Sequence, residues 1–368
     1  MVALISRAHT VTAAATLNRP SRLICPCCND RLTFLSNPVY SRFSIYSGEK
    51  ELPVSDAKMS DMEVVHLPDG GGNTLKALKY KGRLWPAFAP ESIRGVETFK
   101  SRDGDAIVVA YPKSGTHWVW EMTRLLQAGK TDVPMIEKDD GMIEDVLPEK
   151  LESQSSPRAL NTHAHFELMP KEVLNKKNCK LIYVTRDPRD VAVSYFNHHR
   201  KLVQYYEYKG QWKDYFPLYL SGKVDYESWF AYTRGWEQGI KDNPDLQVHV
   251  TSYEALHENT NEEVKKLAQF LGASTDETFI SDVVKMTSFD SMKVSKGKNE
   301  TFKGKDQTEA PIMYRKGKVG DWKNWFTVAQ SEQFNAVFDR EMVGTMAFEL
   351  YSHTKQDQTA PDGNMNER

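Results

Sequence analysis

Three short hydrophobic runs rich in β-branched residues stand out along the chain, at residues 106 to 111 (AIVVAY), 181 to 185 (LIYVT) and 246 to 251 (LQVHVT). Unbroken hydrophobicity over five or six residues is what a parallel strand needs when helices cover both of its faces. Each run therefore predicts a buried strand of a parallel sheet.

Helical patterns lie between and after these runs. Residues 116 to 129 repeat hydrophobic side chains on one helical face and end in a glycine, and residues 261 to 272 begin with acids and also end in a glycine. Residues 327 to 342 begin with Thr327 and Gln330 at the spacing of a capping box. Strands alternating with helices predict a doubly wound α/β fold with a P-loop-like parallel sheet, in which ligands bind beyond the carboxyl ends of the strands.

Composition narrows the class of protein. The 368 residues are 40% hydrophobic and 27% charged, which is enough chain for one large core or two modest ones. A formal net charge of -2 argues against a general nucleic-acid binder, so any anion site must be assembled locally from a few Lys and Arg. The longest apolar runs, of about six residues, are far shorter than the ~20 that span a bilayer, so no transmembrane helix is expected.

The N-terminal stretch has a different composition. Residues 1 to 47 are rich in Arg and Ser and contain one acid, Asp30, which is the composition of a mitochondrial transit peptide. The alternative is an untargeted extension, or a working start at Met59 or Met62. The organisation expected is an extension over 1–58 that is disordered or a transit peptide, a single domain over 59–352 and a flexible tail over 353–368.

The cysteines form no disulfide framework, because Cys25, Cys27 and Cys28 crowd together and Cys179 lies alone in the body. A zinc site on the three clustered thiols would need a fourth ligand, and no Cys or His pair follows at a suitable spacing. The other interpretation is free thiols in a flexible extension.

The stretch VVAYPKSGTHW, residues 108 to 118, joins the first predicted strand to a helix. Such a turn offers successive backbone N–H groups and the positive end of a helix dipole to an oxyanion. Gly115 allows close approach of the backbone, while Lys113, Ser114 and Thr116 add a charge and two hydroxyls. The pattern predicts a phosphate cradle, and the alternative is a surface turn.

The cradle differs from that of ATP and GTP hydrolases, because Lys113 precedes the glycine instead of following it. The second predicted strand is followed by Arg186, a cation where an enzyme that handles Mg²⁺ usually places an acid. The sequence therefore predicts a site for an anion without a metal.

Three ordered blocks, YPKSGTHW, TRDPRDVAVSYFNHHR and RKGKVGDWKNWFTVAQSE, resemble the signature blocks of the cytosolic sulfotransferases. Weaker similarity connects the blocks over most of the body of the chain. That family transfers a sulfuryl group from 3′-phosphoadenosine 5′-phosphosulfate (PAPS) to a hydroxyl or amine. The resemblance implies the PAPS sulfotransferase fold, PAPS as co-substrate and a cytoplasmic location.

The resemblance also implies roles for individual residues. The 5′-phosphosulfate would be held by Lys113, Ser114, Gly115, Thr116 and the backbone of His117, and the adenine would stack on Trp118. The 3′-phosphate would be held by Arg186, Ser194, Arg315, Lys316 and Gly317, and the adenine would also meet Tyr253, Thr287 and Phe289. The plainer alternative for Trp118 is a core aromatic at the start of a helix, and for Tyr253, Thr287 and Phe289 it is a packed loop residue.

The family's catalytic histidine follows a threonine and lies seven residues before a proline, which His163 matches through Pro170. Its neighbour His165 falls where the family often has proline. The resemblance makes His163 the general base that takes the acceptor's proton. Lys113 would stabilise the departing phosphate oxygen, and Ser194 would hold Lys113 when no acceptor is bound.

Some positions depart from the family's pattern. His117 stands where Thr or Asn is common, and Asn161 replaces a commonly basic residue before the catalytic histidine, so both put the rate in doubt. Arg189 and Asp190, inside the second block, are expected to form a solvated or structural pair.

The expected partners are a small-molecule acceptor, such as a phenol or a sterol, and a second copy of the chain. An apolar acceptor pocket would draw on the aromatic-rich segment 195 to 219, with a contribution from Phe88. The spacing of Lys323, Thr327, Val328 and Glu332 resembles the family's homodimer contact, and the alternative is a helix-capping segment.

Two other functions stay open at this point. One is a nucleotide kinase or NTPase that uses the cradle with Mg²⁺, and the other is a catalytically weak PAPS-binding protein.

Overall fold

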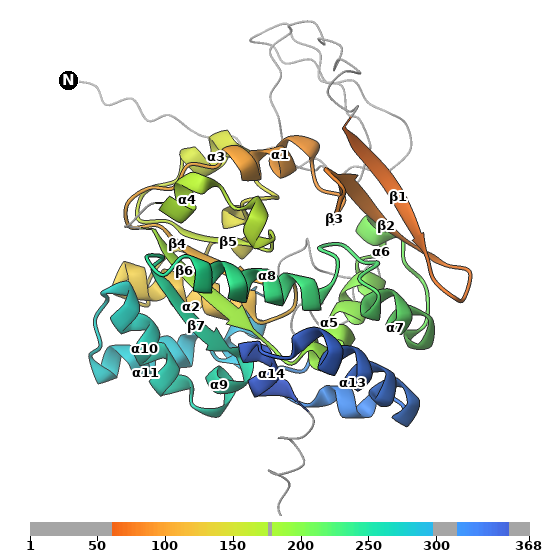
Figure 1. The fold of residues 1–368 in the computed structure, drawn as a ribbon. Coiled ribbons are helices and arrows are strands. Elements are labelled where there is room, and N and C mark those ends of the chain that lie inside the picture. Colours follow the sequence, from red (N-terminus) through yellow and green to blue (C-terminus); the bar gives the residue numbers. More distant parts are fainter. Residues whose placement is uncertain (1–60, 176–178, 297–314, 353–368) are drawn as a thin grey trace, which may run out of the picture. The chain divides into compact units, whose positions relative to one another are not determined.

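A parallel four-stranded sheet with the strand order β5-β4-β6-β7 carries the fold (Figure 1). The computed structural model describes residues 61–175, 179–296 and 315–352. A second, antiparallel sheet joins β1, β2 and β3 in that order. The predicted α/β architecture with a central parallel sheet is confirmed.

The strands are β1 (Met62–Pro68), β2 (Thr74–Tyr80), β3 (Arg83–Trp85), β4 (Ala106–Ala110), β5 (Ala159–Thr162), β6 (Lys180–Thr185) and β7 (Val248–Ser252). The α-helices are α1 (Pro90–Thr98), α2 (Thr116–Ala128), α3 (Pro148–Glu152), α4 (Lys171–Asn175), α5 (Pro188–Lys201), α6 (Val203–Tyr206), α7 (Trp212–Leu220), α8 (Trp229–Asp242), α9 (Tyr253–Glu258), α10 (Thr260–Leu271), α11 (Glu277–Met286), α12 (Phe289–Lys296), α13 (Val328–Met342) and α14 (Met346–Tyr351). Short 3₁₀ helices are η2 (Lys138–Gly141), η3 (Phe166–Leu168) and η5 (Asp321–Asn324).

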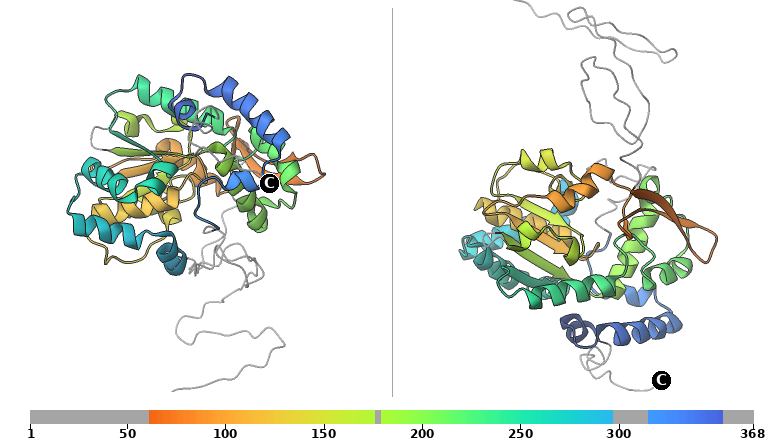
Figure 2. Two further views of the ribbon diagram at one scale, coloured as in Figure 1. Left: turned by 90° about the horizontal axis from the view of Figure 1, so that it is seen from below. Right: turned by 45° about the horizontal axis from the view of Figure 1, so that its top comes forward.

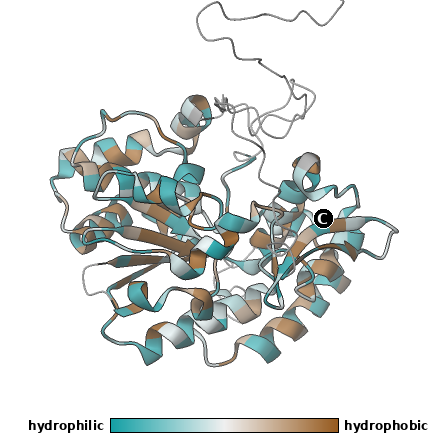
Figure 3. Cartoon of the chain, turned by 90° about the horizontal axis from the view of Figure 1, so that it is seen from above, coloured by the Kyte–Doolittle hydropathy of each residue, from teal (hydrophilic) through white to brown (hydrophobic). Residues whose placement is uncertain are grey.

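Strand β4 is buried on both faces, as its unbroken hydrophobicity predicts. Alternate side chains point to opposite sides of a strand. Ala106, Val108 and Ala110 belong to the cluster that contains the apolar faces of α2 and α10. Ile107 and Val109 belong to the cluster that contains α8. Figure 2 shows helices on both sides of the sheet, and Figure 3 shows hydrophobic residues concentrated on its strands.

The predicted helix ends are confirmed by their geometry. Helices α2 and α10 are each capped by a glycine in the left-handed region, Gly129 with φ 65° and Gly272 with φ 72°. Helix α13 begins at the predicted capping box, in which Thr327 and Gln330 exchange side-chain and backbone hydrogen bonds.

The third hydrophobic run starts later than its pattern predicts. Strand β7 begins at Val248, because the N–H of Leu246 donates to the carbonyl of Asn243 in the turn after α8. The antiparallel sheet and β5 were not predicted. Strand β5 ends in Asn161 and Thr162, so its hydrophobic run is too short to stand out in the sequence.

Some predictions concern residues outside the described ranges. The extension over 1–58, with Cys25, Cys27 and Cys28, and the tail over 353–368 stay predictions. Cys179 is buried and is not part of a disulfide. Within the described ranges, no helix is long and apolar enough to cross a membrane.

A buried ion pair anchors the start of the parallel sheet. The guanidinium of Arg158, before β5, donates to both carboxylate oxygens of Asp105, before β4, at 3.0 and 2.5 Å. The two side chains are 1% and 0% exposed. Arg158 also donates to the carbonyls of Leu151 and Lys100.

Replacing Asp105 with Ala should therefore lower the free energy of unfolding by about 3 to 5 kcal/mol, because an unpaired guanidinium would stay buried. Denaturant unfolding measures the change. Asp103→Ala, at an exposed position in the same loop, is the matched control and should change stability by less than about 0.5 kcal/mol. Equal stability of the two variants would contradict the role of the pair.

Candidate active site

The turn between β4 and α2 has the strained backbone that an anion cradle requires. Lys113 and Gly115 have positive φ values of 69° and 99°. A Cβ at position 115 would lie 2.8 Å from Cδ2 of Tyr253, so the glycine also permits a close approach. The hydroxyls of Ser114 and Thr116 are buried and have no hydrogen-bond partner among the described residues. Unpaired buried hydroxyls at the N-terminus of a helix are suited to bind an oxyanion.

The amino group of Lys113 lies 3.4 Å from Nδ1 of His198 on α5. The other ring nitrogen of His198 lies 3.3 Å from the hydroxyl of Tyr206. Burial, and after it the positive charges of Lys138 and Arg186, lowers the pKa of Lys113 to about 7. A bound anion would raise this pKa again, because it would neutralise the surrounding field. Ser194 lies one helical turn before His198 on α5.

His163 directly follows β5, and its ring is fixed by one strong hydrogen bond. Nδ1 lies 2.7 Å from the carbonyl oxygen of Ala110. A carbonyl only accepts, so Nδ1 carries the hydrogen and Nε2 of the neutral ring carries a free lone pair. Burial, and after it the charge of Lys138, lowers the pKa of His163 to about 3. The ring is therefore neutral at pH 7, which is the form that a general base needs.

His165, the other histidine of the segment, has a different environment. Its Nε2 lies 3.0 Å from the carbonyl oxygen of Tyr226, and its ring packs edge-on against Tyr232 at 5.2 Å. These contacts are those of a packed core histidine with a satisfied N–H.

Arg186, directly after β6, bridges the cradle and the third sequence block. It donates to the carbonyl of Lys113 at 2.9 Å and to the carbonyl of Lys318 at 3.4 Å. Its guanidinium lies 4.1 Å from the ring centre of Tyr253. Its Nε is buried and has no partner among the described residues, so this side chain keeps a donor for a ligand.

The segment that carries Arg315, Lys316 and Gly317 is held by two carboxylates. Arg315 and Lys316 pair with Asp321 at 2.6 and 2.7 Å. Burial acts to raise the pKa of Asp321, but hydrogen bonds from Lys316, Asn324 and Arg315 outweigh it and lower the pKa to about 2. Asp190 on α5 accepts hydrogen bonds from the backbone N–H groups of Gly320 and Trp322 at 2.6 and 2.9 Å.

The expectation for Arg189 and Asp190 was partly wrong. Both side chains are buried rather than solvated, and they contact other residues instead of each other. Arg189 pairs with Asp187 at 2.7 Å and stacks on the ring of Trp322 at 4.3 Å. Their role is structural, because Asp190 fixes the Gly320 turn against the start of α5.

The aromatic residues predicted for adenine gather beside the cradle. Trp118 meets Tyr253 edge-on at 5.6 Å, and its indole N–H has no partner among the described residues. Phe289 lies against Gly317, where a Cβ would be 2.3 Å from Cδ2 of the phenylalanine. Thr287 is fully buried and donates to the carbonyl of Val283 at 2.9 Å, as expected of a packed helix-end residue.

A family model described as a sulfotransferase domain matches residues 103–346, which contain the cradle, His163 and the residues predicted to hold the 3′-phosphate. This chain belongs to the sulfotransferase family. The family and the sulfotransferase activity predicted from the three sequence blocks are thereby confirmed.

Individual relatives agree with the family match. Sulfotransferase 1B1 of Mus musculus is 38% identical over 264 residues, which cover 68% of this chain and 86% of the relative. Sulfotransferase 1C2 of Homo sapiens is 33% identical over 287 residues, which cover 74% and 95%. The crystal structure of mouse sulfotransferase SULT7A1 complexed with PAP superposes with a TM-score of 0.62 at 30% identity and covers 74% of this chain and 97% of that one.

Sequence reasoning missed three residues of this candidate site. Glu144 accepts hydrogen bonds from the backbone N–H of His163 at 2.6 Å and from the hydroxyl of Tyr226 at 3.1 Å. His198 contacts Lys113, and the buried ammonium of Lys138 lies beside Asn161. Lys138 is followed by two acids in the sequence, which is typical of a solvated face, so no local signal marked it.

The aromatic segment expected to line an acceptor pocket contributes largely to the core. Tyr208, Tyr215 and Phe216 are at most 1% exposed, whereas Tyr205 and Trp212 are half-buried. Phe88 is also half-buried and packs against the same core cluster.

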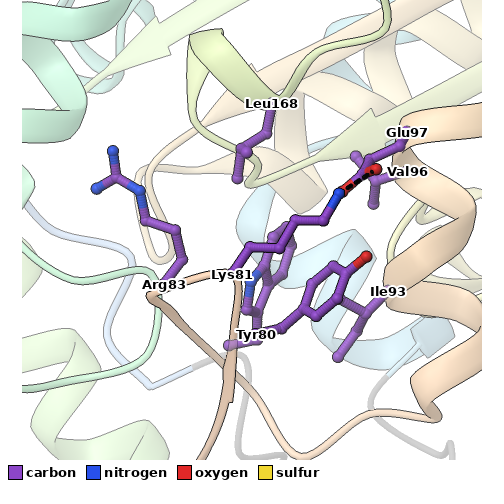
Figure 4. A pocket seen from close by; sticks show the side chains of 8 residues that line it. Tyr80, Lys81, Arg83, Ile93, Val96, Glu97 and Leu168 are labelled. Carbon is purple, nitrogen blue, oxygen red and sulfur yellow. Dashed lines mark hydrogen bonds and ion pairs between the residues drawn. The ribbon is translucent and has the colours of Figure 1, made fainter. Parts of the chain in front are cut away.

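A separate small pocket lies between the β2–β3 hairpin and α1 (Figure 4). An ion pair between Lys81 and Glu97, at 2.6 Å, lies across it above Tyr80 and Ile93. None of the predicted site residues lines this pocket.

Replacing Gly115 with Ala should weaken the binding of PAP, the ligand in the structure of mouse SULT7A1, by about tenfold or more. The added Cβ would collide with Tyr253 and strain the turn. Calorimetric titration measures the affinity. Gly129→Ala, at the other end of α2, is the matched control, since it has positive φ but open space around its Cβ. That variant should keep its affinity, and equal losses in both variants would contradict the cradle.

Proposed function

We propose that this sulfotransferase uses PAPS as donor and transfers the sulfuryl group to a hydroxyl or amine of a small acceptor. The observation that carries the proposal is a set of buried donors without partners among the described residues. They are Ser114 Oγ, Thr116 Oγ1 and Arg186 Nε. They surround a turn in which Lys113 and Arg186 leave positive charge for a bound anion.

The donor site divides into two anion positions and one apolar position. Lys113, Ser114, Gly115 and Thr116, with the N–H of His117, bind the 5′ end. Arg186, Ser194, Arg315, Lys316 and Gly317 bind the 3′-phosphate, which competes with Asp321 for the two cations of the 315–317 segment. Trp118, Tyr253 and Phe289 contact the adenine, with Thr287 behind them.

Catalysis uses the free lone pair of His163. PAPS supplies a sulfuryl group whose bond to the 5′-phosphate oxygen breaks as the acceptor oxygen or nitrogen bonds to sulfur. Nε2 of His163 takes the acceptor's proton, and the hydrogen bond to Ala110 holds the ring in the required tautomer. Lys113 stabilises the negative charge left on the phosphate oxygen. A bound anion offsets the field of the nearby cations, so it raises the pKa of His163 towards a working range.

Transfer of labelled sulfate from PAPS to phenols, sterols and amines tests the reaction directly. Transfer that persists in EDTA would count against a nucleotide kinase that needs Mg²⁺. Binding of PAP without any transfer would instead favour a catalytically weak PAPS-binding protein and overturn the proposal.

The variant His163→Ala should lower kcat by about 10²-fold or more and leave the affinity for PAP unchanged, because the ring acts on the acceptor's proton. Initial rates and calorimetry provide the two readouts. His165→Ala serves as the control, since it removes a packed histidine two residues away and should keep kcat per folded molecule. A normal kcat in His163→Ala would remove the assignment.

A second copy of the chain is the proposed partner, through Lys323, Thr327, Val328 and Glu332. Val328 is 77% exposed at the first turn of α13, and Val319 is 43% exposed nearby in the chain. Exposed apolar side chains favour contact with another surface. Thr327 also caps α13, so the capping alternative accounts for its hydroxyl but not for the exposed Val328.

Val328→Asp should convert a dimer into a monomer, because it places a charge in the apolar contact. Light scattering after gel filtration measures the mass. Val343→Asp is the matched control, since Val343 is 70% exposed at the opposite end of α13. A dimer that survives Val328→Asp, or a wild-type monomer, would exclude this contact.

The organisation expected from the sequence completes the proposal. It comprises an extension over 1–58, one sulfotransferase domain over 59–352, a tail over 353–368 and a cytoplasmic location. Fractionation of cells that express the chain with and without residues 1–58 distinguishes this location from a mitochondrial one.

A further inference from the structure

A lysine outside the three signature blocks is buried beside Asn161, two residues before the candidate catalytic histidine. The side chain of Lys138, in η2, is 3% exposed. Its ammonium lies 3.0 Å from Oδ1 of Asn161, 3.0 Å from Oδ1 of Asp139 and 3.5 Å from the sulfur of Met142. A buried ammonium is costly and persists only where neighbouring groups hold it.

Asn161 holds Lys138 at two points. Its amide oxygen accepts from the ammonium, and its amide N–H donates to the backbone carbonyl of Lys138 at 2.9 Å. Asn161 lies in β5, where it pairs with Val108 of β4, and the N–H of Ile143 donates to its carbonyl. Val108 and Ile143 thus fix the backbone of Asn161 from both sides. The amide of Asn161 is held in place, and the amide in turn holds the ammonium of Lys138.

The position of Asn161 directs this charge towards the site. Side chains two residues apart in an extended segment project to the same side, so Asn161 and His163 share a face at the end of β5. The same strand end lies beside β4, which leads directly into the cradle at Lys113. The counter-ion of Lys138, Asp139, is 28% exposed, so water screens its negative charge more than the buried positive charge.

The electrostatic environment of the site agrees with this geometry. Among charged neighbours, Lys138 contributes most to the lowered pKa of His163 and to the lowered pKa of Lys113. The other charged groups that act on Lys113 are Arg186, Arg315 and Asp139.

We propose that Lys138 is an electrostatic positioning residue of the sulfuryl-transfer site, held by Asn161 so that its charge acts on the transferred anionic group. The ammonium supplies from η2 a positive charge that the uncharged Asn161 does not carry at the end of β5. It favours binding of a negatively charged donor and, together with the larger effect of burial, keeps His163 neutral before the donor arrives. This inference rests on the proposed function.

The test moves the positive charge from position 138 to position 161. Lys138→Met keeps the length of the side chain and should lower kcat by about tenfold or more, because one cation near the anion is lost. In that background Asn161→Lys should restore kcat to within about threefold, since Asn161 is in contact with the original ammonium. Asn161→Lys alone should be impaired, because it places two cations side by side.

The matched control is Lys150→Met, which removes a lysine that pairs with Asp140 but is 47% exposed, and this variant should behave as wild type. A normal kcat in Lys138→Met, or a double variant no better than Lys138→Met, would overturn the inference.

The pH dependence of PAP affinity gives a second readout that needs no turnover. The ligand-free pKa of Lys113 is about 7, so above that pH binding must take up a proton and affinity falls as pH rises. Lys138→Met should raise this pKa and move the fall to higher pH by about one unit, and Asp139→Asn should move it to lower pH.

The two readouts separate this inference from the proposed function. If wild type binds PAP but transfers no sulfate, the proposed function fails, and the shifts in the pH profile still decide the role of Lys138. If Lys138→Met does not fold, the pH profile of Asp139→Asn decides the role of Lys138. Asp139 is partly exposed, and removing its negative charge leaves the positive charge of Lys138 without its counter-ion. An unchanged pH profile in every folded variant would overturn the inference.

Discussion

The site depends on one constraint, the burial of several cations close together in a poorly solvated space. Burial, and after it the positive charges of Lys138 and Arg186, lowers the pKa of Lys113 to about 7. Nearby hydroxyls and a guanidinium nitrogen are buried without partners among the described residues. Such an arrangement costs free energy in the empty protein, and a multiply charged anion relieves the cost. Binding and the electrostatics of the site therefore have the same physical cause.

The parallel sheet is what brings these groups together. Each of its strands delivers a side chain of the candidate site at its carboxyl end: Lys113 after β4, His163 after β5, Arg186 after β6 and Tyr253 after β7. Strands that run parallel end at the same edge, so residues far apart in the sequence become neighbours. The third block joins them because Asp190, in the first turn of α5, binds the backbone of the Gly320 turn.

Rigidity in this site comes from backbone contacts rather than from surface ion pairs. The carbonyl of Ala110 fixes the tautomer of His163, and Glu144 holds the backbone N–H of the same residue. The carbonyl of Lys113 holds Arg186 across the cradle. Because these acceptors belong to the sheet and its adjoining turns, the side chains of the candidate site keep their positions before a ligand arrives.

The sequence by itself determined the parallel strands, the glycine-capped helices, the cradle and the family, because hydrophobic period, cap residues and motif spacing are local properties. It did not reveal β5, whose hydrophobic run stops at Asn161, or the antiparallel sheet. It also left His163 and His165 to be separated by resemblance alone. Only the tertiary structure decided that Lys138 is buried beside Asn161 and that Arg189 and Asp190 serve different partners. Burial and ion pairing depend on contacts between segments that are far apart in the sequence, and a local sequence pattern does not predict those contacts.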